Sequence, residues 1–361
     1  RTEHYDIHTD LPEKAVREAA ARMTAIAEEY QRRTEGFHRK VRGRMPFYLF
    51  SRAEDYYAAG GIDGSAGVYT GEKLMAVAGG IRGLAVWHTI QHEAWHQFAH
   101  KVISSRLPVW LDEGMAEYFA CSVWRGDGFV SGVARRGRVS RIKKLIESKK
   151  TVPFLDMLRM SRREWNGQMS SRNYCQAWAM VHFLIHADDG RYAKRFNAFV
   201  VDVAHRGTPW EKAFITRFGR DAKAFQDRFE AWWLAQSDSP TTEKYTQATV
   251  ETLTSFLARA WARGQRFETA EAFFKAAREG KLRQHESQWL PESLLAVAVR
   301  QARRLKVWRL ERRREEDIPR LVLERADGKT FTGRFRISRG RAGMVKVEIS
   351  RTEPATRPVK R

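Results

Sequence analysis

Cysteine is nearly absent from this chain of 361 residues, which contains only Cys121 and Cys175. Two thiols exclude a disulfide framework and a zinc site built from thiolates, and they leave a single bridge possible. Long apolar runs are also absent, because no stretch approaches the roughly 20 apolar residues that cross a bilayer as a helix. We therefore expect a chain with no transmembrane segment and a core held together by packing.

Acidic residues are outnumbered by basic ones, with 43 Asp and Glu against 65 Lys and Arg and a formal net charge of +22. Residues 301–361 contain 19 Lys and Arg but only 8 Asp and Glu. Their net charge of 19 − 8 = +11 is half of the net charge of the whole chain. Such a region favours an anionic partner (nucleic acid, an anionic membrane surface or an acidic polymer), and a solvated basic face explains it equally well. Aromatic residues are not placed regularly among these arginines, so a dedicated nucleic-acid module is not indicated.

The best linker signal is the polar stretch 237–242. It separates a predicted domain over residues 1–236 from a helical domain over 243–305 and a small basic β domain over 306–352, in which Asp327-Gly328 marks a hairpin. The first domain begins with a small sheet and continues, from about residue 140, as a helical half. The expected fold class is α+β.

Local signals in the first half predict the strands of this sheet. Strands are expected over residues 46–50, 67–69 and 74–78, and Asp10 and Ser51 are candidate N-caps of the helices that follow them. The hairpin 67–78 either holds an extended peptide by main-chain hydrogen bonds or only covers the core.

The most informative motif is His92-Glu93-Ala94-Trp95-His96, inside a predicted apolar helix over residues 84–102. Residues four apart share one helix face, so both imidazoles can approach one ion while Glu93 leans toward the water that the ion holds. Burying these groups costs several kcal/mol unless they find partners, and a cation satisfies all of them. Histidines that are satisfied without a metal are the alternative.

A catalytic zinc ion needs three protein ligands, and Glu113 is the candidate for the third. Residues 111–121 predict a second helix, which would place Glu113 on the ion if it packs antiparallel to the first. Glu117, one turn later, would then hydrogen-bond a ligand histidine, or it is an ordinary exposed acid. His100 lies roughly 12 Å along the helix axis from His92, too far for both to reach one zinc ion.

The motif, together with Trp110-Leu111-Asp112-Glu113-Gly114-Met115-Ala116, resembles the gluzincin metallopeptidases, which include thermolysin and the zinc aminopeptidases. Residues 4–236 look most like the peptidase-MA-like domains of bacteria. The resemblance implies a gluzincin-like catalytic domain, with Glu113 as a zinc ligand and Tyr174 stabilising the oxyanion. Gln176-Ala177 replaces the usual Lys-Gly after that tyrosine, so Tyr174 is as well explained as a core phenol. His182 is a second candidate donor or a packing residue.

The function implied is zinc-dependent hydrolysis of peptide bonds, with Glu93 as the general base on zinc-bound water. No Gly-x-Met-x-Asn segment precedes the motif, which puts exopeptidase action in doubt and favours an endopeptidase acting on peptides or proteins. Related bacterial domains are often exported, which favours an extracytoplasmic location. The alternative is a non-catalytic metal-containing binding protein whose basic C-terminal region contacts an anionic polymer or a partner protein.

Overall fold

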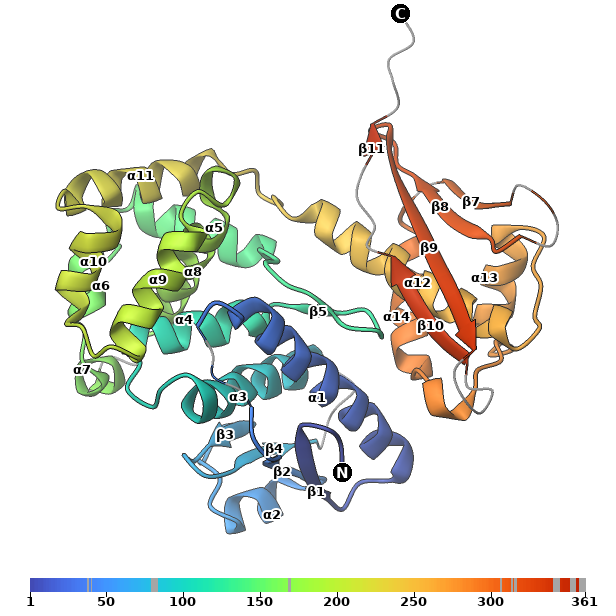
Figure 1. Cartoon of the computed structure of the whole chain (residues 1–361), viewed down its shortest axis with the longest axis horizontal. Coiled ribbons are helices and arrows are strands. Elements are labelled where there is room, and N and C mark those ends of the chain that lie inside the picture. The colour runs from blue at the N-terminus through green and yellow to red at the C-terminus, as the bar shows by residue number, and fades with distance from the viewer. Residues whose placement is uncertain are drawn as a thin grey trace, which may run out of the picture. The chain divides into compact units, whose positions relative to one another are not determined.

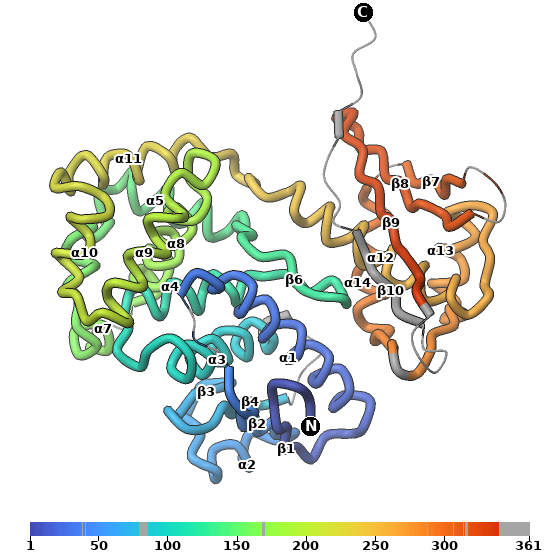
Figure 2. Tube along the Cα trace, in the orientation of Figure 1, coloured from blue at the N-terminus to red at the C-terminus, as the bar shows by residue number. Residues whose placement is uncertain are grey.

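The computed structural model describes residues 1–37, 39, 41–78, 84–167, 170–305, 307–312, 314, 317–339, 345–350 and 355–356 (Figures 1 and 2). The chain divides into two compact units. Unit 1 comprises residues 1–122 and 131–241, and unit 2 comprises residues 123–130 and 242–361. Both units combine helices with β-strands, so the α+β class expected from the sequence is confirmed.

Unit 1 begins with a four-stranded sheet of order β1-β2-β4-β3. Its strands are β1 (Tyr5–Thr9), β2 (Met45–Phe50), β3 (Gly67–Tyr69) and β4 (Leu74–Val77). β1 and β4 lie parallel to β2, while β3 pairs antiparallel with β4 and forms an edge of the sheet. A parallel pair needs a crossover connection, and α1 (Glu13–Thr34) supplies it between β1 and β2.

Both N-caps predicted for the first two helices are wrong. α1 is preceded by Pro12, and α2 (Ala53–Ala58) by Arg52, in each case without a side-chain cap. The carboxylate of Asp10 instead accepts hydrogen bonds from the backbone N–H and the hydroxyl of Ser51. The two residues meet because β1 and β2 are parallel and paired, so their carboxyl ends are neighbours.

Two helices of unit 1 carry the sequence motifs. α3 (Leu84–Val102) has the predicted bounds and packs against β3 and β4. α4 (Val109–Ala120) follows after Pro108, packs against α3, and is buried along its whole length. It therefore lies between α3 on one side and α8 (Ser171–Gly190) on the other.

The second half of unit 1 is helical, as the sequence predicted (Figure 1). Besides α8 it contains α5 (Arg136–Glu147), α6 (Phe154–Arg159), α7 (Arg162–Gly167), α9 (Ala193–Ala204), α10 (Trp210–Phe218) and α11 (Ala222–Ala235). Aromatic side chains dominate the core between these helices. Trp233 of α11, for example, packs on Trp178 and donates its indole N–H to the carbonyl of Ala179 at 3.2 Å.

Unit 2 joins the helices and the strands that follow the predicted linker. It contains α12 (Thr242–Ala262), α13 (Ala270–Arg278), η1 (Glu286–Gln288), α14 (Glu292–Ala302) and an antiparallel sheet of order β10-β9-β8-β7. The strands are β7 (Val307–Glu311), β8 (Arg320–Glu324), β9 (Lys329–Arg339) and β10 (Val345–Ser350), and β11 (Ala355–Thr356) pairs with β9. α12 packs on this sheet, so the helical and β segments share one unit.

Unit 2 also takes in the short hairpin of β5 (Val123–Trp124) and β6 (Phe129–Val130), which the sequence placed in the first domain. The carboxylate of Asp127 in its turn forms an ion pair with the buried guanidinium of Arg259 at 2.6 Å. Arg125 pairs with the buried carboxylate of Glu251 at 3.1 Å. Arg259 and Glu251 both lie on α12. These ion pairs join the hairpin to unit 2, although it precedes the rest of that unit in the sequence.

Cys121 and Cys175 are both buried free thiols, so the one bridge that the sequence allowed is not formed. None of the described helices combines the length and the apolar character needed to cross a bilayer.

The contact between α4 and α8 depends on Gly114. A Cβ atom at Gly114 would lie 2.6 Å from the carbonyl oxygen of Ala177 and 2.8 Å from a methyl group of Val181. We expect Gly114→Ala to reduce the free energy of unfolding by about 1–3 kcal/mol, because one helix must move away from the other. Urea unfolding measures this. Gly137→Ala in α5 is the control, since a Cβ there meets no atom within 4 Å and the change should be neutral or slightly stabilising. Equal stability of both variants would contradict the prediction.

Candidate metal centre

α3 and α4 bring three candidate ligand atoms together. His92 and His96 are one turn apart on α3, and their Nε2 atoms lie 3.1 Å from each other. Oε2 of Glu113, on α4, lies 3.2 Å from Nε2 of His92 and 3.5 Å from Nε2 of His96. The structure therefore brings together the three residues that the sequence proposed as ligands.

The dimensions of this triangle fit a small tetrahedral cation. Zinc bonds of about 2.0–2.1 Å meeting at tetrahedral angles place neighbouring donor atoms about 3.3–3.4 Å apart, close to the three separations given above. In addition, Oε2 of Glu113 is buried and has no partner of hydrogen-bond geometry among the described residues. Such an orphaned oxygen is costly unless it has a positive partner. Two nitrogens and one carboxylate oxygen form a donor set that suits zinc.

Each histidine is oriented by a carboxylate on its other ring nitrogen. Nδ1 of His92 lies 3.3 Å from Oε1 of Glu117, and Nδ1 of His96 lies 3.0 Å from Oδ1 of Asp112. An Nδ1–H that donates to a carboxylate leaves the lone pair on Nε2, which is the arrangement that a metal ligand requires. The structure thus places Glu117 behind His92, on the side away from Glu113.

Asp112 is the residue that sequence reasoning missed. Its side chain is buried, and besides His96 it lies 3.3 Å from Nε2 of His100 and 3.1 Å from Nη2 of Arg162. Burial opposes its charge, but the imidazoles of His96 and His100 hold the pKa of Asp112 well below its ordinary value. Its position directly before Glu113 was the only signal. This contact also gives His100 a role, because its imidazole binds the carboxylate that orients His96.

Two arginines complete the surroundings of the site. Arg138 of α5 forms an ion pair with Glu117 and lies 3.4 Å from Nε2 of His88. Arg162 of α7 is about half exposed, and its Nη1 lies 3.6 Å from Oε1 of Glu113. Neither arginine was singled out in the sequence, because both come from helices distant along the chain.

The buried carboxylates give the site a strong preference for positive charge. Burial opposes protonation of His92, but the carboxylates of Glu113 and Glu117 outweigh it and raise the pKa of this imidazole to about 9. Burial also opposes ionisation of Glu113, yet the two histidines lower its pKa to about 2. Without a cation, protons on the histidines supply the positive charge that these carboxylates need. A divalent ion can take their place.

Glu93 lies on α3 directly after His92, and one of its oxygens is fixed by the sheet. The backbone N–H of Tyr69, on edge strand β3, donates to Oε2 of Glu93 at 2.8 Å. This bond holds the carboxylate of Glu93 against the edge strand, one residue after the candidate ligand His92.

Tyr174 lies in the first turn of α8, the helix that packs against α4. Its half-buried ring lies 6.2 Å from the ring of His92 and 5.1 Å from that of Trp165. Burial raises the pKa of Tyr174, and the neighbouring charge of Glu113 raises it further. His182, two turns later, instead faces the carbonyl of Gly132 at 3.4 Å and packs on Trp178. We therefore assign it to packing.

Residues 86–204 match a family described as "Protein of unknown function (DUF1570)". This range runs from the first turn of α3 to the end of α9 and contains every candidate site residue named in the sequence. No curated protein and no solved structure matches the chain.

We expect Asp112→Asn to weaken zinc binding at this centre by about 10–100-fold, because the amide no longer fixes the ring and tautomer of His96. Competition against a chromophoric chelator measures the affinity. Asp156→Asn is the matched control, since Asp156 is an exposed acid of α6. Unchanged affinity in Asp112→Asn would contradict the assignment of Asp112.

Proposed function

We propose that this protein hydrolyses peptide bonds in a zinc-dependent reaction, cleaving peptides or proteins within the chain. The observation that carries the proposal is the donor triangle of His92, His96 and Glu113, on a helix in which Glu93 directly follows the first ligand and is held by the edge strand. A site that only stores a cation needs ligands, whereas a hydrolytic site also needs a base next to the ion.

Glu93 is the proposed general base. A bound zinc ion would polarise the scissile carbonyl and lower the pKa of a water molecule. Glu93 takes the proton of the attacking water and later passes it to the departing amine. Because the N–H of Tyr69 fixes one carboxylate oxygen of Glu93, the other oxygen is the proposed proton acceptor.

Tyr174 is the proposed donor to the developing oxyanion. A tyrosine is protonated at neutral pH, and the raised pKa of Tyr174 keeps its O–H available to donate in more alkaline solution as well. A donor that meets charge only in the transition state lowers the barrier without tightening substrate binding. The half-exposed guanidinium of Arg162 is a further positive group near Glu113.

The edge strand β3 is the proposed substrate platform. Thr70 donates its N–H to Lys73, and Val77 donates to Ala66, which leaves the peptide groups of Gly67 and Tyr69 facing away from β4. An extended peptide added to this edge would form main-chain hydrogen bonds with the outward groups other than the N–H of Tyr69, which Glu93 already accepts. It would pass next to Glu93, because the N–H of Tyr69 already reaches that carboxylate. Such pairing needs no free chain end, which supports cleavage within a chain.

We expect Glu93→Gln to lower kcat by about 10²–10⁴-fold while zinc content stays unchanged, because the amide cannot accept the proton. Zinc analysis and digestion of a mixed peptide library measure the two effects. Glu72→Gln, at an exposed position in the turn after β3, is the control.

Two outcomes would contradict this account. If Glu93→Gln cleaves peptides at the wild-type rate, Glu93 is not the general base. Zinc-loaded wild type that cleaves no peptide would favour the non-catalytic binding protein instead.

We expect Tyr174→Phe to lower kcat by about 10²–10³-fold with little change in KM, since the lost bond forms only in the transition state. Steady-state kinetics on a peptide cleaved by the wild type measures both constants. Tyr57→Phe, at an exposed phenol of α2, serves as the control. A change confined to KM would place Tyr174 in substrate binding and contradict its assigned role.

A further inference from the structure

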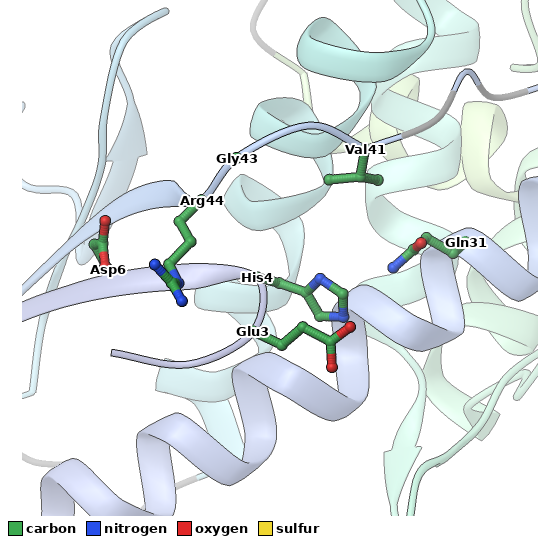
Figure 3. Close-up of a pocket in the computed structure, with 7 residues that line it drawn as sticks. All are labelled: Glu3, His4, Asp6, Gln31, Val41, Gly43 and Arg44. Atoms are coloured by element: carbon green, nitrogen blue, oxygen red, sulfur yellow. The ribbon is translucent and has the colours of Figure 1, made fainter.

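A second cluster of possible metal ligands lies at an open pocket beside the start of β1 (Figure 3). The pocket has a volume of about 770 Å³. It is lined by residues that precede or begin β1, by one residue of α1, and by the segment that leads into β2: Glu3, His4, Asp6, Gln31, Val41, Gly43 and Arg44. All belong to unit 1 and lie outside the range 86–204.

His4 is the unusual residue of this pocket. The residue is only 8% exposed, and the hydrogen bonds that it forms with described residues use its backbone and not its imidazole. The backbone is fixed, because Met45 donates its N–H to the carbonyl of His4 at 2.8 Å, and the N–H of His4 donates to the hydroxyl of Thr2 at 3.3 Å. Figure 3 shows the ring lying at the pocket beside the Glu3 side chain. The ring lines the pocket and is joined to no described side chain by a hydrogen bond, so it is open to a ligand that enters there.

Two carboxylates face this imidazole. One ligand atom each of Glu3, His4 and Glu28 lies within 4.8 Å of the other two. Glu28 projects from α1, and both glutamates are exposed, so their side chains can move inward. Partial burial raises the pKa of Glu28 and the charge of Glu3 adds to this, although His4 opposes it. Repulsion between the two acids is what a cation relieves.

We propose that Glu3, His4 and Glu28 form a second metal site, which takes a divalent transition-metal ion such as zinc. An imidazole beside two carboxylates favours such ions over magnesium and calcium, which prefer oxygen ligands only. The three ligands leave coordination positions that face the pocket, where water completes the shell.

The proposed ion has a structural consequence. Glu3 and His4 belong to the segment at the start of β1, whereas Glu28 belongs to α1. One ion bound to all three would fasten this segment to α1 and stabilise unit 1 by mass action. Arg44 lines the same pocket, but its Nε donates to the carbonyl of Thr2 at 2.6 Å, which holds the guanidinium to the backbone.

The test uses the full chain with the first centre removed by His92→Ala and His96→Ala. Titration calorimetry with ZnCl₂ should detect one remaining equivalent, and adding His4→Ala should abolish it. His8→Ala on the same background is the matched control, because His8 lies in β1 outside the cluster and stacks on Tyr48. Zinc binding that is equal in the His4→Ala and His8→Ala backgrounds would overturn the proposal.

A second variant guards against a folding defect in His4→Ala. Glu28→Gln keeps the size of an exposed side chain and should weaken zinc binding on the same background by at least about tenfold, since even groups behind a ligand contribute that much. Zinc should also raise the Tm of the background protein but not that of the Glu28→Gln protein. Unchanged affinity in Glu28→Gln, or equal affinity for Mg²⁺ and Zn²⁺, would overturn the proposal.

Discussion

The packing of α4 against α3 is the contact on which the rest of this structure depends. It sets the carboxylate of Glu113 against the Nε2 atoms of His92 and His96, in a region from which water is largely excluded. Buried carboxylates and imidazoles at this spacing need positive charge between them. The same packing places Glu117 and Asp112 on the outer nitrogens of the two rings, so one helix contact supplies both the third candidate ligand and the groups that orient the two imidazoles.

Unit 1 surrounds this contact with elements that have separate tasks. The sheet supports α3 from one side and fixes Glu93 through the N–H of Tyr69. On the other side α8 packs so closely on α4 that Gly114 has no room for a side chain, and it brings Tyr174 to the centre. A site on packed helices and a strand is held more rigidly than one on loops.

The sequence predicted site residues that lie close together along the chain. It did not predict contacts between residues that are far apart along the chain. Spacing on one helix was enough for His92 and His96, and the phrase around Glu113 pointed to the third residue of the cluster. Asp112 was missed because an acid in the first turn of a helix has an ordinary explanation, and only the packing of α4 turns it toward His96. Pairs between distant residues also explain two predictions that differ from the structure. Ser51 binds Asp10, so neither residue caps a helix, and Asp127 binds Arg259, which places the β5–β6 hairpin in unit 2. The sequence did not point to His4 either, because Glu28, which lies near its imidazole, is far away along the chain.

We propose above all that two imidazole nitrogens and one carboxylate oxygen of this protein converge on one zinc ion. X-ray absorption at the zinc edge is the most direct measurement, made on the chain loaded with one equivalent of zinc and carrying His4→Ala so that only the first centre is occupied. The account predicts two imidazole nitrogens at about 2.0–2.1 Å and oxygen ligands at about 2.0–2.2 Å in a four-coordinate shell. A spectrum without imidazole scattering, or one unchanged by Glu113→Ala, would contradict it.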